Sequence, residues 1–242
     1  MVQHFITRKG RGTLSLFFAG WGMDFHPFSD YASGDADLMI CYDYTDLGFG
    51  YGILEEYGKI KITAWSMGVW AAEHVLKVHE NISGNISGNI SEAIAINGTP
   101  LPADDLYGIP ENIFLGTLEN LSEASGKAAD TVDRFRRRMC GDAGTFRTFM
   151  EKAPERDTGS LRDELASIWT RCRDEKERKD NEKPDGSRIS RIWTGAVVCS
   201  KDRIFPAANQ QRFWDEAATA YTLADGAHYC EDIMRTEILA CR

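Results

Sequence analysis

The stretch KIKITAWSMG at residues 59–68 decides the fold. Its first six residues, rich in isoleucine and threonine, predict a strand. From Met67 to Val78, apolar side chains recur at helical spacing and predict a helix that follows at once. Ser66 therefore stands in a tight turn between a strand and a helix.

A serine in such a turn, with small residues two positions away on either side, is typical of the nucleophile elbow of α/β-hydrolases. The turn exposes the hydroxyl, and the small neighbours relieve crowding. Here Gly68 is one small residue, and Ala64 stands where the usual pattern has glycine. Because serine is common in turns, an ordinary structural turn is an equal alternative for the motif alone.

Further short apolar runs predict the rest of a sheet. They end at turn residues and occupy residues 14–18, 38–42, 93–96, 193–199 and 220–223. Runs of this kind, spaced by crossovers, favour an α/β fold with a mostly parallel central sheet covered on both faces. Residues 5–7 and the run from Leu14, joined by RKGRG, suggest an antiparallel edge hairpin.

The sequence changes character between about residues 119 and 188. Apolar residues recur at helical spacing over Ala128–Met139 and Leu161–Cys172, and Ser160 with Asp163 suggests a capping box. These patterns predict an inserted α-helical lid. The predicted division is an α/β-hydrolase core of residues 1–118 and 189–242, with the lid at residues 119–188.

A glycine-rich turn after the first long strand accompanies the elbow. It reads FAGWG at residues 18–22, where hydrolases place a loop that donates one N–H to the oxyanion hole. The backbone N–H groups of Trp21 and Met67 are therefore the predicted oxyanion donors. The alternative for the two glycines is an ordinary turn from a strand to a helix.

The predicted acid and base lie in the C-terminal part of the chain. Asp202 follows an apolar strand, and His228 comes 26 residues later, after another short strand. The chain order Ser, Asp, His matches α/β-hydrolases and differs from the chymotrypsin and subtilisin orders. His228 would take the proton of Ser66, and Asp202 would orient the imidazole. Asp225 is a rival for the acid, although a loop residue is the simpler interpretation.

Composition and residue spacing argue against several other classes. The net charge of −9 argues against nucleic-acid binding, and no apolar run is long enough to span a membrane. MVQHFITRKGRG at the start has no apolar signal region, so we expect a cytoplasmic protein with reduced cysteines. The five histidines form no ligand array, and we expect neither a metal nor a cofactor. The Asn-Ile-Ser-Gly repeat at residues 81–91 is expected to be a solvated loop.

Together these stretches resemble the BioG family of pimeloyl-[acyl-carrier protein] methyl ester esterases. The resemblance rests on the arginine-rich lid and on GWG at 20–22, AWSMG at 64–68, INGTP at 96–100 and YGIP at 107–110. It covers nearly the whole chain, with the Asn-Ile-Ser-Gly repeat as a local insertion. It implies hydrolysis of pimeloyl-[acyl-carrier protein] methyl ester to pimeloyl-[acyl-carrier protein] and methanol in biotin biosynthesis. The residue pattern by itself indicates only a serine hydrolase.

The charge distribution fits a partner such as an acidic acyl carrier protein. Residues 127–188 carry 16 Lys and Arg against 14 Asp and Glu, so the rest of the chain has a net charge of −11. A basic lid could orient an acidic carrier protein, although a solvated helix face is the alternative. The arginines predicted to bind the carrier protein are Arg134, Arg136, Arg137 and Arg138.

Two other functions remain open at this stage. A thioesterase or a broad small-ester carboxylesterase could use the same triad, because esters and thioesters pass through the same kind of tetrahedral intermediate. A non-catalytic binding protein on a hydrolase scaffold is the alternative of another class. The complete set of Ser66, Asp202 and His228 weighs against that last interpretation.

Overall fold

A computed structural model describes residues 1–32, 34–83, 89–181 and 192–240. Residues 84–88 of the Asn-Ile-Ser-Gly repeat lie outside the described residues. So do residues 182–191, which contain the predicted boundary between lid and core, and Cys241. The five other cysteines carry free thiols.

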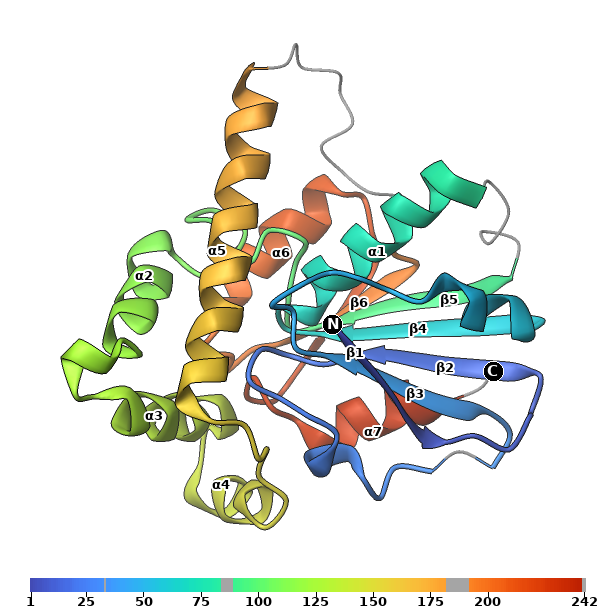
Figure 1. Cartoon of the computed structure of the whole chain (residues 1–242), viewed down its shortest axis with the longest axis horizontal. Coiled ribbons are helices and arrows are strands. Elements are labelled where there is room, and N and C mark those ends of the chain that lie inside the picture. Colours follow the sequence, from blue (N-terminus) through green and yellow to red (C-terminus); the bar gives the residue numbers. More distant parts are fainter. Residues whose placement is uncertain (33, 84–88, 182–191, 241–242) are drawn as a thin grey trace.

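Seven strands form one sheet in the order β1-β3-β2-β4-β5-β6-β7 (Figure 1). Every neighbouring pair is parallel except β1 with β3, so the predicted mostly parallel sheet is confirmed. The strands are β1 (Val2–Thr7), β2 (Thr13–Phe18), β3 (Asp37–Tyr42), β4 (Lys59–Trp65), β5 (Ile90–Ile96), β6 (Gly195–Cys199) and β7 (Tyr221–Ala224).

The N-terminal strand lies antiparallel at the edge, but its partner differs from the predicted one. In β1, Val2 stands opposite Tyr42 and Phe5 opposite Met39, so β1 pairs with β3. The predicted hairpin with the next strand is wrong, because β2 pairs in parallel with both β3 and β4. Residues 14–18 of β2 are fully buried, which suits a strand covered on both faces, whereas β1 is only half-buried.

Helices cover both faces of the sheet (Figure 1). The helices α1 (Gly68–Ser83) and α6 (Ala207–Glu216) lie on one face, and α7 (Glu231–Leu239) lies on the other. Two short 3₁₀ helices, η1 (His26–Phe28) and η2 (Tyr51–Glu56), fill connections between strands. In the part of the chain that is described, no helix is long and apolar enough to cross a membrane.

A group of helices between β5 and β6 stands beyond the end of the sheet at which β4 gives way to α1 (Figure 1). They are α2 (Glu111–Asn120), η4 (Glu123–Ser125), α3 (Ala128–Cys140), α4 (Ala143–Met150) and α5 (Thr158–Asn181). Because α2 packs on α3 and α5, the group begins before residue 119. The boundaries of the lid, 119 and 188, stay predictions.

The start of α5 also differs from the predicted capping box. Ser160 lies inside the helix, and its N–H donates to Asp157 Oδ1 at 2.9 Å. This hydrogen bond holds the pKa of Asp157 below its usual value. The cap is therefore Asp157, because a carboxylate three residues before an N–H of the first turn accepts from it directly.

Candidate active site

The turn after β4 holds Ser66 in a backbone conformation that side chains other than glycine seldom adopt. Its φ is 61°, in the left-handed region. The N–H of Ser66 donates to the carbonyl of Ile96 at 2.9 Å, and its own carbonyl accepts from the N–H of Val69 at 3.1 Å. The neighbouring strand and the first turn of α1 therefore hold this conformation in place.

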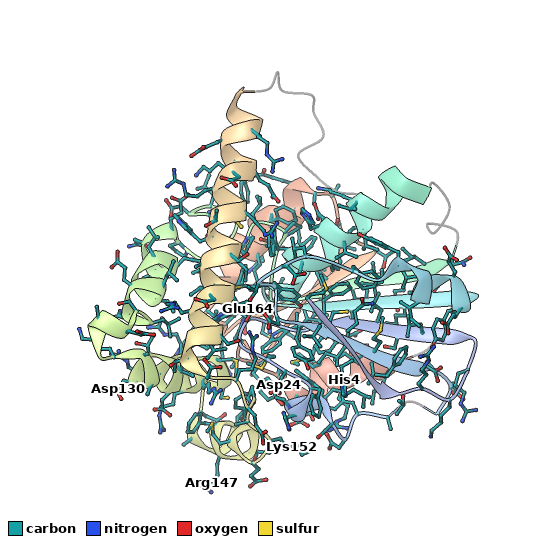
Figure 2. The ribbon with its side chains drawn as sticks, viewed as in Figure 1. His4, Asp24, Asp130, Arg147, Lys152 and Glu164 are labelled. Atoms are coloured by element: carbon teal, nitrogen blue, oxygen red, sulfur yellow. The ribbon has the colours of Figure 1, made fainter. Side chains whose placement is uncertain are left out.

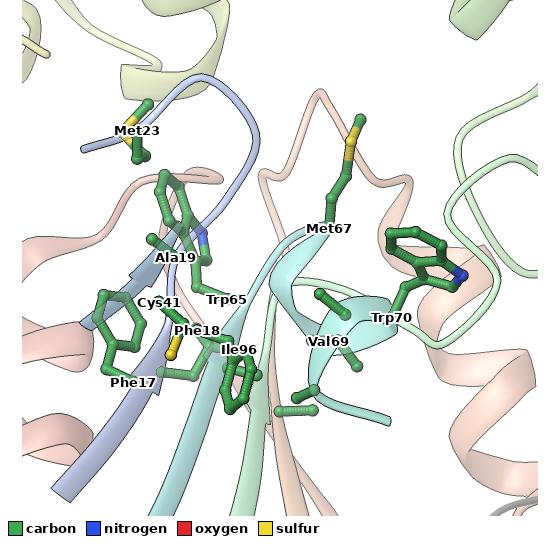
Figure 3. Close-up of a cluster of buried hydrophobic side chains, with 14 of the residues drawn as sticks. Phe17, Phe18, Ala19, Met23, Cys41, Trp65, Met67, Val69, Trp70 and Ile96 are labelled. Carbon is green, nitrogen blue, oxygen red and sulfur yellow. The ribbon is translucent and has the colours of Figure 1, made fainter. Parts of the chain in front are cut away.

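Close backbone approaches around the turn require glycine. A Cβ added at Gly68 would collide with the carbonyl oxygens of Phe18 and Ala19, and one at Gly98 would collide with the carbonyl of Ser66. Figure 3 shows Met67 beyond the end of β4, with Ala19 on the neighbouring strand end. The elbow thus packs directly against the loop that follows β2.

Ser66, His228 and Asp202 form a hydrogen-bonded chain. Ser66 Oγ lies 2.9 Å from His228 Nε2, and His228 Nδ1 lies 2.8 Å from Asp202 Oδ2. The three residues follow β4, β7 and β6, so the carboxyl ends of separate strands bring them together. His228 is 1% exposed and Ser66 is 3% exposed. The predicted three residues therefore lie in reach of one another, in the geometry that transfers a proton from a hydroxyl to an imidazole.

Both carboxylate oxygens of Asp202 are held in place. Oδ1 accepts from the N–H groups of Ile204 and Phe205 at 2.8 and 2.9 Å. Oδ2 accepts from Gln210 Nε2 at 3.0 Å as well as from the imidazole. A carboxylate with donors on both oxygens stays oriented toward the imidazole.

The rival acid, Asp225, lies elsewhere. Its side chain is 75% exposed and pairs with Lys201 at 2.6 Å. The hydrogen bond from Lys201, together with the positive charge of that side chain, lowers the pKa of Asp225. The structure thus joins Asp202, and not Asp225, to His228.

The backbone around His228 is fixed by two side chains that sequence reasoning did not select. Its carbonyl accepts from Trp65 Nε1 at 2.9 Å and from Asn97 Nδ2 at 2.8 Å. Asn97 Oδ1 in turn accepts from the N–H of Cys199 at 2.7 Å. In the sequence, Asn97 stands out only as part of INGTP, which gives it no specific role. No pattern in the sequence marks Gln210 as a partner of Asp202.

The two predicted oxyanion donors are available. Among the described residues, the backbone N–H groups of Trp21 and Met67 have no hydrogen-bond partner, although both residues are buried. Their loops meet, because a Cβ at Gly20 would lie 3.1 Å from Ser66 Cβ. Buried N–H groups are rarely left unpaired, so a pair of them beside a serine hydroxyl is suited to a negatively charged oxygen.

A small pocket with a cavity volume of about 30 Å³ lies beside these donors. Its lining is mostly apolar and comes from the two loops, from α2, α3 and α5, and from the turn after Asp202. These residues are Trp21, Met67, Ile109, Ile113, Phe114, Thr117, Phe135, Arg138, Leu165 and Ile204. An outer groove of about 260 Å³ between α2 and α3 shares Ile113, Thr117, Phe135 and Arg138 with it.

The four predicted lid arginines do not share one face of α3. Arg134 and Arg138, one helical turn apart, are exposed and line the outer groove. Arg136 is half-buried and donates to the carbonyl of Pro154 at 3.3 Å, and burial lowers its pKa. Only the first two therefore face the route to the pocket.

Arg137 points to a different part of the lid. It pairs with Asp133 at 2.7 Å and lies over the ring of Phe146, 4.2 Å from the centroid. Arg147 lies farther away, at the end of the molecule formed by α4 (Figure 2). No group of three or more potential metal ligands occurs among the residues that the structure covers.

Comparison with known protein families gives one match over most of the chain. The model described as "Pimeloyl-ACP methyl esterase BioG" matches residues 1–235. A crystal structure of BioG from Haemophilus influenzae is 35% identical, with a TM-score of 0.75, and the match covers 95% of this chain and 94% of that one. An esterase from Thermogutta terrifontis is 12% identical with a TM-score of 0.58, covering 94% and 84%, and supports the α/β-hydrolase fold alone.

Curated relatives are also similar. An uncharacterised protein of Haemophilus influenzae (strain ATCC 51907 / DSM 11121 / KW20 / Rd) is 37% identical, covering 89% of this chain and 88% of its own length. A malonyl-[acyl-carrier protein] O-methyltransferase of Bacteroides fragilis (strain 638R) is 42% identical over 92% of this chain. This chain spans only 41% of that methyltransferase's length. The predicted family resemblance and the predicted fold are both confirmed by these matches.

Proposed function

Because the chain belongs to the BioG family of pimeloyl-ACP methyl esterases, we propose that it is a serine esterase that hydrolyses pimeloyl-[acyl-carrier protein] methyl ester. The products are pimeloyl-[acyl-carrier protein] and methanol. The observation that carries the proposal is the hydrogen-bonded chain of Ser66, His228 and Asp202 beside two unpaired N–H groups.

The proposed mechanism has two stages. His228 Nε2 takes the proton of Ser66 as the hydroxyl oxygen attacks the ester carbonyl, and Asp202 stabilises the imidazolium. The oxyanion receives hydrogen bonds from the N–H groups of Trp21 and Met67, each a contribution of about 2.7–4 kcal/mol. The imidazolium then gives its proton to methoxide, and methanol leaves an acyl-serine. Water attacks the acyl-serine by the same route and restores the free hydroxyl.

The pocket and groove support an acyl chain that enters from the lid. The inner pocket beside Met67 is lined mostly by apolar side chains, which suits the methylene chain of a pimeloyl group. The outer groove carries Arg134 and Arg138 at its surface. These two arginines are the proposed contacts for the acidic carrier protein, and they would act mainly on its rate of association.

A comparison of three substrates tests the proposal. The carrier-bound methyl ester, a free methyl ester and a carrier-bound acyl thioester are each incubated with the wild type, and methanol or thiol release is followed. We expect release of methanol from the carrier-bound ester by the wild type and by Ser29→Ala, a surface serine at the end of η1, and none by Ser66→Ala. Faster cleavage of the thioester would make the chain a thioesterase, and no cleavage of any substrate would leave the binding-protein alternative.

A further inference from the structure

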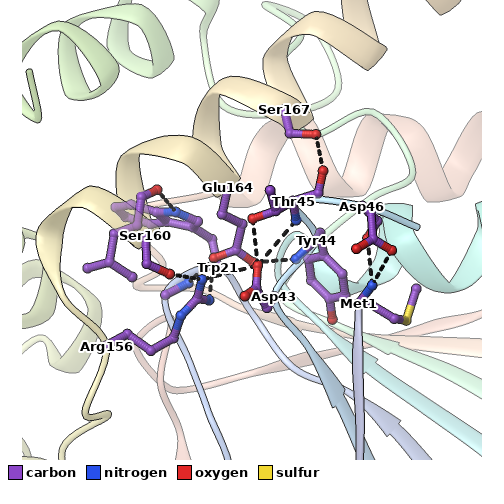
Figure 4. A network of polar contacts seen from close by, with 12 residues as sticks. Met1, Trp21, Asp43, Tyr44, Thr45, Asp46, Arg156, Ser160, Glu164 and Ser167 are labelled. Atoms are coloured by element: carbon purple, nitrogen blue, oxygen red, sulfur yellow. Dashed lines mark hydrogen bonds and ion pairs between the residues drawn. The ribbon is translucent and has the colours of Figure 1, made fainter. Parts of the chain in front are cut away.

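A buried carboxylate of α5 reaches the loop that carries the proposed oxyanion donor. Glu164 is 0% exposed, and its Oε2 accepts from the N–H of Gly22 at 3.3 Å. Its Oε1 accepts from the N–H of Tyr44, just past the end of β3, at 2.9 Å. Figure 4 shows Glu164 between Trp21 on one side and Tyr44 on the other, and Figure 2 shows its place on α5.

The charge of this carboxylate is compensated inside the protein. Arg156 Nη1 donates to Glu164 Oε2 at 2.6 Å. Arg156 Nη2 donates to Ser160 Oγ at 2.7 Å and lies 3.2 Å from Asp43 Oδ1. The guanidinium side chain is only 8% exposed. Burial raises the pKa of Glu164, and the charge of Arg156 opposes that change. The carboxylate is thus an acceptor built into the interior, with donors on both oxygens.

The same helix holds the preceding residue of the loop. The indole Nε1 of Trp21 donates to the carbonyl of Leu161 at 2.9 Å, one turn of α5 before Glu164. Gly22 itself has a φ of +76°, a backbone conformation that residues with a side chain rarely adopt. Two consecutive loop residues are therefore bound to two consecutive turns of one helix: Trp21 through its side chain, and Gly22 through the N–H of the peptide unit that joins it to Trp21.

We propose that Glu164 is a positioning residue for the oxyanion hole: by holding Gly22, it sets the direction of the Trp21 N–H. The inference rests on the proposed function, because the Trp21 N–H matters only if an oxyanion forms at Ser66. It assigns to α5 the role of positioning the loop that carries the oxyanion donor, in addition to lining the pocket. A displaced donor weakens the stabilisation of the transition state and leaves the binding of the substrate in its ground state almost unaffected.

The matched control is another contact between α5 and the core. Ser167 Oγ, three residues along α5 from Glu164, donates to the carbonyl of Thr45 at 2.8 Å. Among the described residues, it makes no hydrogen bond to the Gly20–Gly22 loop. Ser167→Ala removes one hydrogen bond between helix and core without disturbing the donor. If Glu164 only stabilises the fold, its variant and Ser167→Ala should differ in the free energy of unfolding and not in kcat.

The test compares Glu164→Leu and Ser167→Ala with the wild type on a soluble methyl ester. Leucine removes both carboxylate oxygens, so the N–H groups of Gly22 and Tyr44 each lose their acceptor. We expect kcat to fall about 10- to 100-fold with KM within about twofold. The affinity for an alkylboronic acid, which adds to Ser66 as a tetrahedral adduct, should fall by the same factor as kcat. Ser167→Ala should keep the kcat and the boronic acid affinity of the wild type.

A second variant keeps the test valid if Glu164→Leu does not fold. Glu164→Leu with Arg156→Met removes both buried charges and still leaves the N–H of Gly22 without an acceptor, so the same losses are expected. Wild-type kcat and boronic acid affinity in a folded variant, or equal losses in Ser167→Ala, would overturn the inference while leaving the esterase intact. A wild type that hydrolyses no ester would instead overturn the proposed function.

Discussion

Asp202→Asn is expected to lower kcat about 10⁴-fold while the protein remains folded. The N–H groups of Ile204 and Phe205 both point at Oδ1, so an asparagine keeps its carbonyl oxygen there and turns its NH₂ toward His228. That NH₂ donates to Nδ1, forces the imidazole proton onto Nε2 and removes the acceptor for the Ser66 hydroxyl. A wrong tautomer of this kind costs a factor of about 10⁴, or about 5 kcal/mol of barrier.

The same geometry gives the cost in stability. Gln210 Nε2 loses its bond to Oδ2 and keeps its bond to the carbonyl of Phe205 at 2.8 Å, so the free energy of unfolding should fall by about 1–3 kcal/mol. The assay is kcat on a soluble methyl ester, with urea unfolding on the same samples. Asp225→Asn is the control, and its kcat should equal that of the wild type. An Asp202→Asn variant with more than about a tenth of wild-type kcat, or an equal loss in Asp225→Asn, would refute the reasoning.

Three further predictions concern docking, the elbow and the edge of the sheet. Arg134→Glu should lower kcat/KM for the carrier-bound ester severalfold and leave a soluble ester unchanged, because Arg134 lines the outer groove and not the inner pocket. Arg137→Glu, outside the groove, should alter neither, and moderate salt should weaken only the carrier-bound reaction. Gly68→Ala should lower the free energy of unfolding by more than about 2 kcal/mol in denaturant titration, since its Cβ meets two carbonyl oxygens; wild-type stability would contradict the packing described around the elbow. Burial opposes ionisation of Asp37, but hydrogen bonds from backbone N–H groups and the Tyr57 hydroxyl lower its pKa. The ionised carboxylate therefore stabilises the fold fully above the unfolded pKa of about 4, and this stabilisation is lost as the pH falls through the folded pKa. Asp37→Asn should be less stable than the wild type at pH 7, and the difference in the free energy of unfolding should shrink toward pH 2.

The three residues of the proposed triad could be predicted because each follows an apolar strand. The carboxyl ends of parallel strands lie at one edge of a sheet, so Ser66, Asp202 and His228 converge without further information. The partner of β1 could not be predicted in this way. An edge strand can pair only with a strand that still has a free side. Because β2 lies between β3 and β4, β1 pairs with β3, although β2 is the strand nearest to it in the sequence.

The lid arginines show how helical geometry limits an argument from clustering. Residues four apart share a face of a helix, as Arg134 and Arg138 do, whereas Arg136, two positions from Arg134, turns away from it and contacts Pro154. Position in the helix could have made this distinction from the sequence. It could not have separated Arg137, which lies three positions from Arg134 and is held instead by Asp133 and the ring of Phe146. The role of Glu164 could not have been found, because its spacing from Leu161 places it beside the apolar face of α5 but does not identify the loop residues that it binds.

The helices over the sheet divide into two parts with different physical character. The first part of α5 is bonded to core loops through Leu161, Glu164 and Ser167, so its position is tied to the loop beside Ser66. By contrast, α2 and α3 form the walls of the outer groove, and Arg134 and Arg138 extend from the latter. Substitutions in the groove can therefore change which acyl chain or carrier is admitted without moving the proposed oxyanion donor. Substitution of Glu164, on the core side of α5, is expected to lower kcat for every ester. Substitutions in the groove are expected to affect the carrier-bound substrate alone.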